Sequence, residues 1–271
     1  MNMLQRRLED PEVLVRLNAF FLSYFGWVAF GVLYGVIGRW SLDLTPQFLR
    51  LPLTSRDLVV GLVEFTKSIP PLYALFTVVY YLGFAGSIAI IVAYLLLYLR
   101  DLEASDQLLA RYLMAYTVAG AIYLLFHIYA PHIVYNLPGY ISNNTLLTRQ
   151  EFVLPSLHNT FIMINIITLW KYRKRLGARA VILVNALIPF ATVFLGHHWV
   201  YDVITGFLLG VAVSKVSWDW GARISEVIYQ WEVSSLRRVT IFNFFLAVIV
   251  LIVAADPARV LAIFGGLLPG P

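Results

Sequence analysis

The sequence contains no cysteine and few charged residues. None of its 271 residues is Cys, and Asp, Glu, Lys and Arg together make up 13%. Without thiols the protein has no disulfide, no thiolate nucleophile and no metal site bound through cysteine. A soluble globular protein has about 25% charged residues, so the scarcity of charge indicates that water is not the main solvent of this chain. Its chemistry has to come from His, Asp, Glu, Lys, Arg, Ser or Tyr.

The sequence is rich in apolar residues. Apolar residues make up 60% of the chain and the mean hydropathy is +0.78, whereas soluble proteins have roughly 45–50% apolar residues. Apolar runs of about 20 residues can cross a bilayer as helices. We therefore expect an all-α fold, a polytopic membrane helical bundle with about six to seven transmembrane helices. Residues 1–271 are expected to form a single integral membrane domain.

The expected spans lie between polar or proline-containing stretches. They cover residues 18–38, 72–99, 112–130, 155–170, 180–195, 202–218 and 239–255. An amphipathic piece at 57–66 is expected to lie in the membrane interface, before the Pro70-Pro71 pair. Residues 131–154 are read as a polar loop, and residues 218–238 as an amphipathic connector.

Positive charges are unevenly shared between alternate loops. With the N-terminus in the cytoplasm, fourteen of the 20 Lys and Arg residues fall on the cytoplasmic side and six on the other. Loops rich in Lys and Arg favour the cytoplasm. We therefore predict a cell-membrane protein with a cytoplasmic N-terminus. The net charge of +5 comes from short membrane-flanking runs such as Lys171–Arg175, so we expect no nucleic-acid partner.

Two segments that contain histidine stand at the starts of expected helices. The first reads Pro-Ser-Leu-His at 155–158, and the second reads Gly-His-His-Trp-Val-Tyr-Asp at 196–202. His198 and Asp202 are four residues apart, so on a helix they lie on one face within reach of a hydrogen bond. A carboxylate on one ring nitrogen fixes the histidine tautomer and leaves the other nitrogen basic. A nucleophile or a general base requires this arrangement.

In the predicted topology both segments open on the extracytoplasmic face. His158 and Asp202 then lie in the first turns of two helices, where unpaired amides and the helix dipole favour a bound anion. Ser156 adds a hydroxyl donor. A phosphate between the two helix ends would have His158, His197 and His198 nearby. We therefore expect a phosphate-binding active site on the extracytoplasmic face.

The two motifs together resemble the type 2 phosphatidic acid phosphatase superfamily. His198 follows His158 by 40 residues, and the combination is most similar to the branch that includes inositol phosphorylceramide synthases. The resemblance covers roughly residues 112–218, the expected catalytic core. It implies a phosphoryl-transfer site. The implied roles are nucleophile for His198, orienting residue for Asp202, general acid for His158, phosphate-binding hydroxyl for Ser156 and pocket lining for His197.

Two cationic features of these phosphatases are missing. Ala191 and Thr192 stand where the phosphatases carry a Ser-Arg pair, and no Lys with Arg-Pro seven residues later precedes Pro155. The missing cations suit a phosphodiester or lipid-diphosphate substrate better than a phosphomonoester. The residues expected to supply positive charge instead are His132, Arg149 and Lys67.

We interpret the protein as a membrane enzyme that needs no metal or cofactor. It is expected to move a phosphoryl group from a phospholipid or an isoprenoid phosphate through a phosphohistidine intermediate. Hydrolysis, as in a lipid phosphatase, and transfer to an acceptor alcohol, as in an inositol phosphotransferase, both stay open. Two alternatives are a Zn²⁺ site built from the same His and Asp side chains, and a transporter that uses the helix-end anion site without chemistry. His127 is read as a packing residue of the third span.

Overall fold

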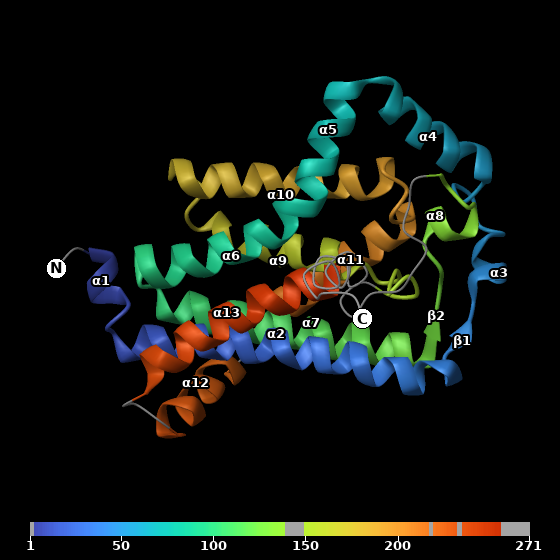
Figure 1. The fold of residues 1–271 in the computed structure, drawn as a ribbon. Helices are drawn as coiled ribbons and strands as arrows, with labels where there is room; N and C mark the ends of the chain where they lie inside the picture. Colours follow the sequence, from blue (N-terminus) through green and yellow to red (C-terminus); the bar gives the residue numbers. More distant parts are fainter. Residues whose placement is uncertain (1–2, 139–148, 217–218, 232–234, 256–271) are drawn as a thin grey trace, which may run out of the picture.

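The computed structural model is a bundle of long helices with roughly parallel axes (Figure 1). It describes residues 3–138, 149–216, 219–231 and 235–255. In this part of the chain the helices long and apolar enough to cross a membrane are Pro11–Trp40, Pro70–Leu99, Leu102–Leu125 and Leu176–Phe194, and two shorter apolar helices cover Leu157–Trp170 and Val200–Ser214. The expected all-α membrane bundle is thus confirmed, and the chain is an integral membrane protein.

The first span begins earlier than the apolar pattern predicted. After the short helix α1 (Met3–Arg7), α2 runs over Pro11–Ile37 and continues into the 3₁₀ turn η1 (Gly38–Trp40). Asp10 caps α2 by accepting a hydrogen bond from the backbone N–H of Glu12 at 3.1 Å, and Pro11 fills the first turn. A cap followed by proline starts a helix regardless of hydrophobicity. The polar residues before 18 therefore belong to the same helix.

The second span changes its helical winding twice. It consists of α5 (Pro70–Val78), the π-helical segment η2 (Val79–Gly83), α6 (Phe84–Ala93) and the π-helical segment η3 (Tyr94–Leu99). It ends at Arg100, whose φ of 55° turns the chain into the left-handed region. The prediction of one helix over 72–99 is thus right in extent. The hydrophobic pattern gave no sign of the two π segments.

The third span was misplaced by the sequence prediction of 112–130. Helix α7 covers Leu102–Leu125 and begins at Asp101, which accepts a hydrogen bond from the N–H of Ala104 at 3.0 Å. The charged first turns are accommodated because Asp106 pairs with Arg16 of α2 at 2.8 Å. The helix ends where Phe126 turns to extended backbone.

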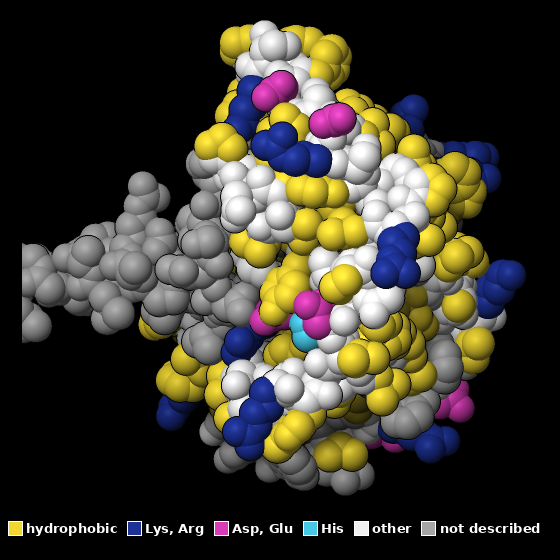
Figure 2. All heavy atoms as spheres, turned by 90° about the vertical axis from the view of Figure 1, so that its right-hand side faces the viewer, with side chains coloured by type: hydrophobic (Ala, Val, Ile, Leu, Met, Phe, Trp, Pro, Cys, Tyr) yellow, Lys and Arg dark blue, Asp and Glu magenta, His cyan; other side chains and the backbone are white. Residues whose placement is uncertain are grey.

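One end of the bundle is closed by short elements. The strands β1 (Leu42–Asp43) and β2 (Phe126–His127) pair in parallel, beside the short helices α3 (Thr45–Phe48) and α8 (Pro131–Val134). The amphipathic piece expected at 57–66 is helix α4 (Arg56–Ser68). Figure 2 shows this end, where charged side chains are scattered among hydrophobic ones. The expected polar loop at 131–154 contains 139–148, which lie outside the described residues.

The remaining helices follow the predicted order. They are α9 (Leu157–Trp170), α10 (Leu176–Phe194), α11 (Val200–Ser214), α12 (Trp220–Trp231) and α13 (Leu236–Ala255). Helix α12 lies within the expected connector, and α13 corresponds to the seventh expected span. Helix α13 is held against α2 by Asn18, which donates to Thr240 at 2.9 Å and accepts from Asn243 at 2.8 Å. Side-chain hydrogen bonds of this kind join helices that have no hydrophobic reason to associate in lipid.

A buried polar network fixes α9 at the centre of the bundle. Asn165 of α9 accepts a hydrogen bond from the Tyr112 hydroxyl of α7 and donates to Asn185 of α10 at 3.1 Å. Ser87 of α6 donates to the same Asn185 oxygen at 3.3 Å. Four helices therefore share one satisfied polar cluster within the membrane. The first turn of α9, which carries His158, is positioned by this framework.

Candidate active site

Two glycines allow α11 to lie directly against α9. A Cβ atom at Gly206 would come within 2.5 Å of the backbone oxygen of Ser156, and one at Gly210 within 2.8 Å of the backbone oxygen of Thr160. Residues four apart lie on the same face of a helix. A stripe without side chains therefore lets the two backbones approach closely, as in other membrane helix pairs. This approach brings the two histidine segments together.

The N-terminus of α9 is tied to α11 by Ser156. The Ser156 N–H donates to the backbone oxygen of Asp202 at 3.2 Å. Its hydroxyl oxygen caps α9 by accepting from the N–H of Asn159 at 3.3 Å and from the Asn159 amide at 2.9 Å. These bonds use only acceptor capacity, so the Ser156 hydroxyl hydrogen is left to donate into the site. Ser156 is completely buried.

The loop before α11 presents His198. Gly196, with φ of +71°, turns the chain after α10, in a conformation that glycine adopts without strain. The N–H groups of His197 and His198 both donate to the backbone oxygen of Thr192 at 3.0 Å. Thr192 occupies the position of the missing arginine, so at that point the loop is held by a backbone carbonyl and no guanidinium is present.

Asp202 lies beside the inner nitrogen of His198. Its Oδ2 accepts a hydrogen bond from the Trp199 N–H at 2.7 Å and lies 3.4 Å from His198 Nδ1. The pair is close enough for an ion pair, but its alignment is not that of a hydrogen bond, and Asp202 Oδ1 has no partner among the described residues. Catalytic hydrogen bonds are often long before substrate binds. Both side chains are at least 95% buried.

The outer nitrogen of His198 faces His158 and Ser156. His198 Nε2 lies 3.4 Å from His158 Nδ1 and 3.4 Å from Ser156 Oγ. His158 is partly exposed, whereas His198 is buried. The chain therefore brings together two imidazoles and a hydroxyl at the ends of two helices.

Aromatic rings of the second span form one wall of the cluster. The Tyr80 ring stacks on His197 with centroids 4.2 Å apart and planes within 4° of parallel, and lies 5.5 Å from His158. The Phe84 ring lies 4.3 Å from His158. Tyr80 belongs to η2, and π segments occur frequently at functional sites. Sequence reasoning missed both residues, because an aromatic residue in an apolar run is ordinary and nothing local marks it.

His132 completes the group of rings. Its ring lies 5.2 Å from that of His197, and both its backbone N–H and its Nδ1 lie 3.1 Å from the oxygen of Gly196. Burial lowers the pKa of His132 below its usual 6.5, and the Gly196 bond only partly offsets this effect. His132 thus lies beside His197, and its lowered pKa disfavours the positive charge expected of it.

The other two expected cations lie in different places. The Lys67 ammonium, at the end of α4, donates to the backbone oxygen of Pro138 at 3.3 Å, in the loop that follows His132. The Arg149 guanidinium instead donates to Gly31 of α2 at 3.0 Å. Its described contacts are therefore with α2, and none of them is with the histidines. No group of three or more His, Cys, Asp or Glu suited to a metal ion occurs in the part of the chain that the structure describes.

Comparison with known proteins bears on this cluster. Residues 107–226 match the family model of the PAP2 superfamily. The matched segment contains His158, His198 and Asp202, so the part of the chain that carries the histidine cluster is similar to PAP2 proteins. The fold is accordingly an all-α membrane bundle, and residues 107–226 within it are similar to the PAP2 superfamily. PAP2 proteins are in general phosphatases or phosphotransferases that act on phosphate-bearing substrates, and the match supports an activity of this class.

One relative extends the similarity over most of the chain. An uncharacterized protein of Methanocaldococcus jannaschii is 29% identical over 222 residues, which cover 81% of this chain and 90% of the relative. No solved structure matches the chain. The relative carries no functional description. The resemblance to the inositol phosphorylceramide synthase branch is therefore a matter for proposal.

Proposed function

We propose that the protein is a metal-independent membrane enzyme that transfers a phosphoryl group from a lipid substrate through His198. The observation that carries this proposal is the convergence of His198 Nε2 and His158 Nδ1 at 3.4 Å, with Asp202 beside the opposite nitrogen of His198. Two imidazoles at one point can serve the two ends of a phosphoryl transfer. The PAP2 match supports the same class of reaction.

The nucleophile is His198 Nε2. We assign the proton of His198 to Nδ1, facing Asp202, because a carboxylate favours the N–H tautomer on its own side. Nε2 then carries the lone pair and accepts from the Ser156 hydroxyl. Attack forms a P–N bond to His198 and breaks the bond between phosphorus and the leaving oxygen. His158 donates its proton to that oxygen.

The second half of the reaction restores the enzyme. Neutral His158 takes a proton from water or from an acceptor alcohol, whose oxygen attacks phosphorus while the P–N bond to His198 breaks. Water gives hydrolysis, and an alcohol such as inositol gives headgroup transfer. Because the two rings now touch, the substrate has to separate His158 from His198 as it enters. His158 is the more exposed of the two rings.

Charge on the phosphate is met by several weak donors. The N-termini of α9 and α11 point their unpaired amides and positive dipole ends toward the cluster. Ser156 supplies a hydroxyl, His197 and His132 line the pocket, and Lys67 supplies positive charge beside the loop after His132. Arg149 is not one of the proposed phosphate-binding residues of this site, because its described contacts lie on α2. A site with few fixed cations suits a phosphodiester or diphosphate, which agrees with an inositol phosphotransferase-like reaction.

The substrate we propose is a phospholipid or an isoprenoid phosphate. Tyr80 and Phe84 of the second span form an apolar wall beside His158, so the group attached to the leaving oxygen meets hydrocarbon rather than water. With the N-terminus in the cytoplasm, the site opens on the extracytoplasmic face. The lipid would then enter from the leaflet on that side.

The decisive experiment uses ³²P-labelled lipids with the purified protein in detergent. Lipid monophosphates, diphosphates and phosphodiesters are supplied with and without inositol or diacylglycerol, and EDTA is added in parallel. We expect product, and an acid-labile labelled protein, for the wild type but neither for His198→Ala. Thermal melting checks that the variant is folded. Activity that is lost with EDTA would point to a Zn²⁺ site, and tight phosphate binding without any product would favour the transporter.

A further inference from the structure

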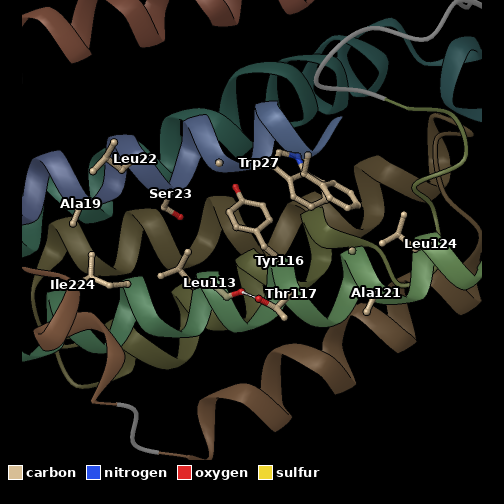
Figure 3. Close-up of a pocket in the computed structure, with 13 residues that line it drawn as sticks. Ala19, Leu22, Ser23, Trp27, Leu113, Tyr116, Thr117, Ala121, Leu124 and Ile224 are labelled. Atoms are coloured by element: carbon tan, nitrogen blue, oxygen red, sulfur yellow. Dashed lines mark hydrogen bonds between the residues drawn. The ribbon is translucent and has the colours of Figure 1, made fainter. Parts of the chain in front are cut away.

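An apolar groove follows the line between α2 and α7 (Figure 3), and no histidine is among its lining residues. It encloses about 530 Å³ and is lined from Ala19 to Phe30 on α2 and from Leu113 to Leu124 on α7. The helices run side by side here, because Trp27 stacks on Tyr116 at 4.5 Å. Ile224 of α12 closes one end of the groove. The rim residues Leu22 and Leu124 are 46% and 37% exposed, so the groove opens on the membrane-facing surface.

A polar pocket of about 340 Å³ lies farther along the same two helices. On α2 it begins at Tyr34, one helical turn beyond Phe30, and the two rings are 6.1 Å apart. Its charged lining consists of Arg39, Arg149, Asp43 and Glu151. Figure 2 shows a histidine in a hollow beside acidic side chains on this end of the molecule. An apolar groove is thus followed by a polar pocket in the order that an amphiphile requires.

The depth of the two features matches that of a lipid. The groove extends along α2 from residue 19 to residue 30, a rise of roughly 16 Å at about 1.5 Å per residue. This length is about half of the ~30 Å hydrocarbon core, the depth of one leaflet. At the polar pocket, the Arg39 guanidinium lies 4.4 Å from the ring centre of Trp40, which is 68% exposed. Exposed Trp beside Arg is typical of the membrane–water interface.

Arg149 lies where the groove meets the pocket. It donates through one terminal nitrogen to the oxygen of Gly31, and the guanidinium lies 5.9 Å from the Tyr34 ring centre. Its Nε has no hydrogen-bond partner among the described residues. A guanidinium at this depth is suited to a phosphate. Asp43 and Glu151 line the same pocket, and carboxylates are suited to the hydrogen-bond donors of a headgroup.

We propose that the α2–α7 groove and the adjoining polar pocket bind one membrane phospholipid outside the catalytic cluster. A hydrocarbon chain lies in the groove, the phosphate lies at Arg149, and hydrogen-bond donors of the headgroup face Asp43 and Glu151. The one-leaflet length favours a lipid chain over a helix of a second copy, which would need an apolar contact across the whole bilayer. This inference does not depend on the proposed reaction, because none of these residues belongs to the histidine cluster.

Gly26 offers a direct way to fill the groove. A Cβ atom there would meet nothing within 4 Å, so Gly26→Leu places a side chain in the groove without a clash. Gly86 of α6 has equally open surroundings but lies outside the groove, and Gly86→Leu is the matched control. Trp27 lines the groove and reports occupancy. If the quenching disappears in Trp27→Phe, the lipid that causes it lies in this groove.

The test titrates full-length protein in detergent with phosphatidylethanolamine that carries brominated chains. We expect saturable quenching of Trp27 in the wild type. Gly26→Leu should weaken the affinity for the lipid about tenfold or more, which corresponds to the loss of about one buried side chain. Gly86→Leu should bind the lipid as the wild type does. Arg149→Gln should weaken the affinity for the phospholipid about tenfold, as expected for the loss of a charge-assisted hydrogen bond. Brominated diacylglycerol, which lacks phosphate, should bind this variant and the wild type equally weakly.

Three results would overturn the inference. They are equal quenching in Gly26→Leu and wild type, no preference of the wild type for phosphatidylethanolamine over diacylglycerol, and a loss of dimer in Gly26→Leu by analytical ultracentrifugation with unchanged quenching. The last result would assign the groove to a second copy of the chain. Thermal melting checks folding of Arg149→Gln. If Arg149→Gln does not fold, the Gly26 and Gly86 pair together with the two lipids still decides the question.

Discussion

His158 and His198 have different surroundings, which fit the different roles that we propose for them. His198 is 5% exposed and lies between Asp202 on one side and Ser156 on the other. His158 is partly exposed and lies against Phe84, with its Nδ1 directed at His198. The oriented ring suits a nucleophile, and the accessible ring suits proton exchange with a leaving group and with water.

The role of His158 can be separated from that of His198 by the choice of leaving group. We expect His158→Ala to lower kcat about 10²–10⁴-fold for a substrate with an alcohol leaving group, because a positioned acid contributes this much. A p-nitrophenyl ester of the same phosphoryl group should lose much less, because a nitrophenolate leaves without being protonated. Steady-state rates with both substrates measure this difference. Equal losses for the two substrates would contradict the role of general acid.

Helices α9 and α11 form the element on which the site depends. Their close approach rests on Gly206 and Gly210, and the Ser156 N–H bond to Asp202 ties their ends together. A shift of α11 by the width of one methyl group would move His198 relative to His158. Catalysis is sensitive to displacements of this size. The glycines therefore matter for geometry as well as for packing.

Gly206→Ala tests this dependence. The added Cβ would lie 2.5 Å from a backbone oxygen, which cannot yield as a side chain can. We expect a loss of about 1–3 kcal/mol in stability from overpacking, and a fall in activity even where the protein is folded. Gly86→Ala, with nothing within 4 Å, is the control and should be neutral or slightly stabilising. Chemical denaturation and turnover are measured for both, and a Gly206→Ala protein as active as the control would refute the argument.

At the opposite end of the bundle, Asp101 joins two elements. It caps α7, accepts a hydrogen bond from Lys171 at 2.7 Å and accepts another from the Tyr172 hydroxyl. Partial burial of Asp101 opposes its ionisation, but the hydrogen bonds from Lys171 and Tyr172 outweigh this and lower its pKa below the usual 3.8. The bond to Asp101 raises the pKa of Lys171 above 10.5. The turn between α9 and α10 is thus fastened to the start of α7.

These shifts define a pH window for the contribution of the pair to stability. A lowered Asp pKa means that the contribution is complete above pH 3.8 and is lost as the pH falls through the lower folded value. A raised Lys pKa means that it is complete below pH 10.5 and is lost as the pH rises through the higher folded value. We expect the melting temperature of Asp101→Asn to lie below that of the wild type by a constant amount inside this window. The gap should narrow in acid, and a gap that widens there would contradict the assignment.

The whole molecule has two unlike ends. One end carries the cluster, the β1–β2 pair and α4, and the other carries the basic turn that begins at Lys171 and the amphipathic helix α12 (Figure 1). Trp40, 68% exposed, ends η1 just before β1, and Trp170, 54% exposed, ends α9 just before the basic turn. Such tryptophans mark the two membrane interfaces. The excess of positive charge near Lys171 predicts that its end faces the cytoplasm.

The natural lack of cysteine makes this topology simple to test. Arg50→Cys and Lys174→Cys each introduce one thiol at an exposed position, at the two opposite ends. We expect a membrane-impermeant maleimide to label Arg50→Cys in intact cells, and Lys174→Cys only after permeabilisation. The cysteine-free wild type shows the background. The opposite labelling pattern would place the N-terminus and the histidine cluster on the other sides of the membrane.

Local sequence determined much of this protein. The apolar runs, the prolines and the capping residues fixed the class of fold and the order of the helices, because helix formation and membrane burial depend on neighbours in the chain. The spacing of His198 and Asp202 predicted that they lie side by side on a helix. They do lie side by side, but His198 is in the loop before α11, so the turn at Gly196 places it there and helical spacing does not. The start of α7 was misjudged, because its charged first turns become tolerable only through the ion pair of Asp106 with Arg16, 90 residues away.

Only the tertiary structure decided which distant residues share the site. Tyr80 and Phe84 reach the histidines from the second span, whereas Arg149 lies against α2. These placements depend on how whole helices pack, and on glycines whose role becomes visible only when a neighbouring backbone is in place. Hydrophobic periodicity specifies that a helix is buried but not which helix covers it. The two histidine motifs could therefore be predicted from the sequence, whereas the residues that pack around them could not.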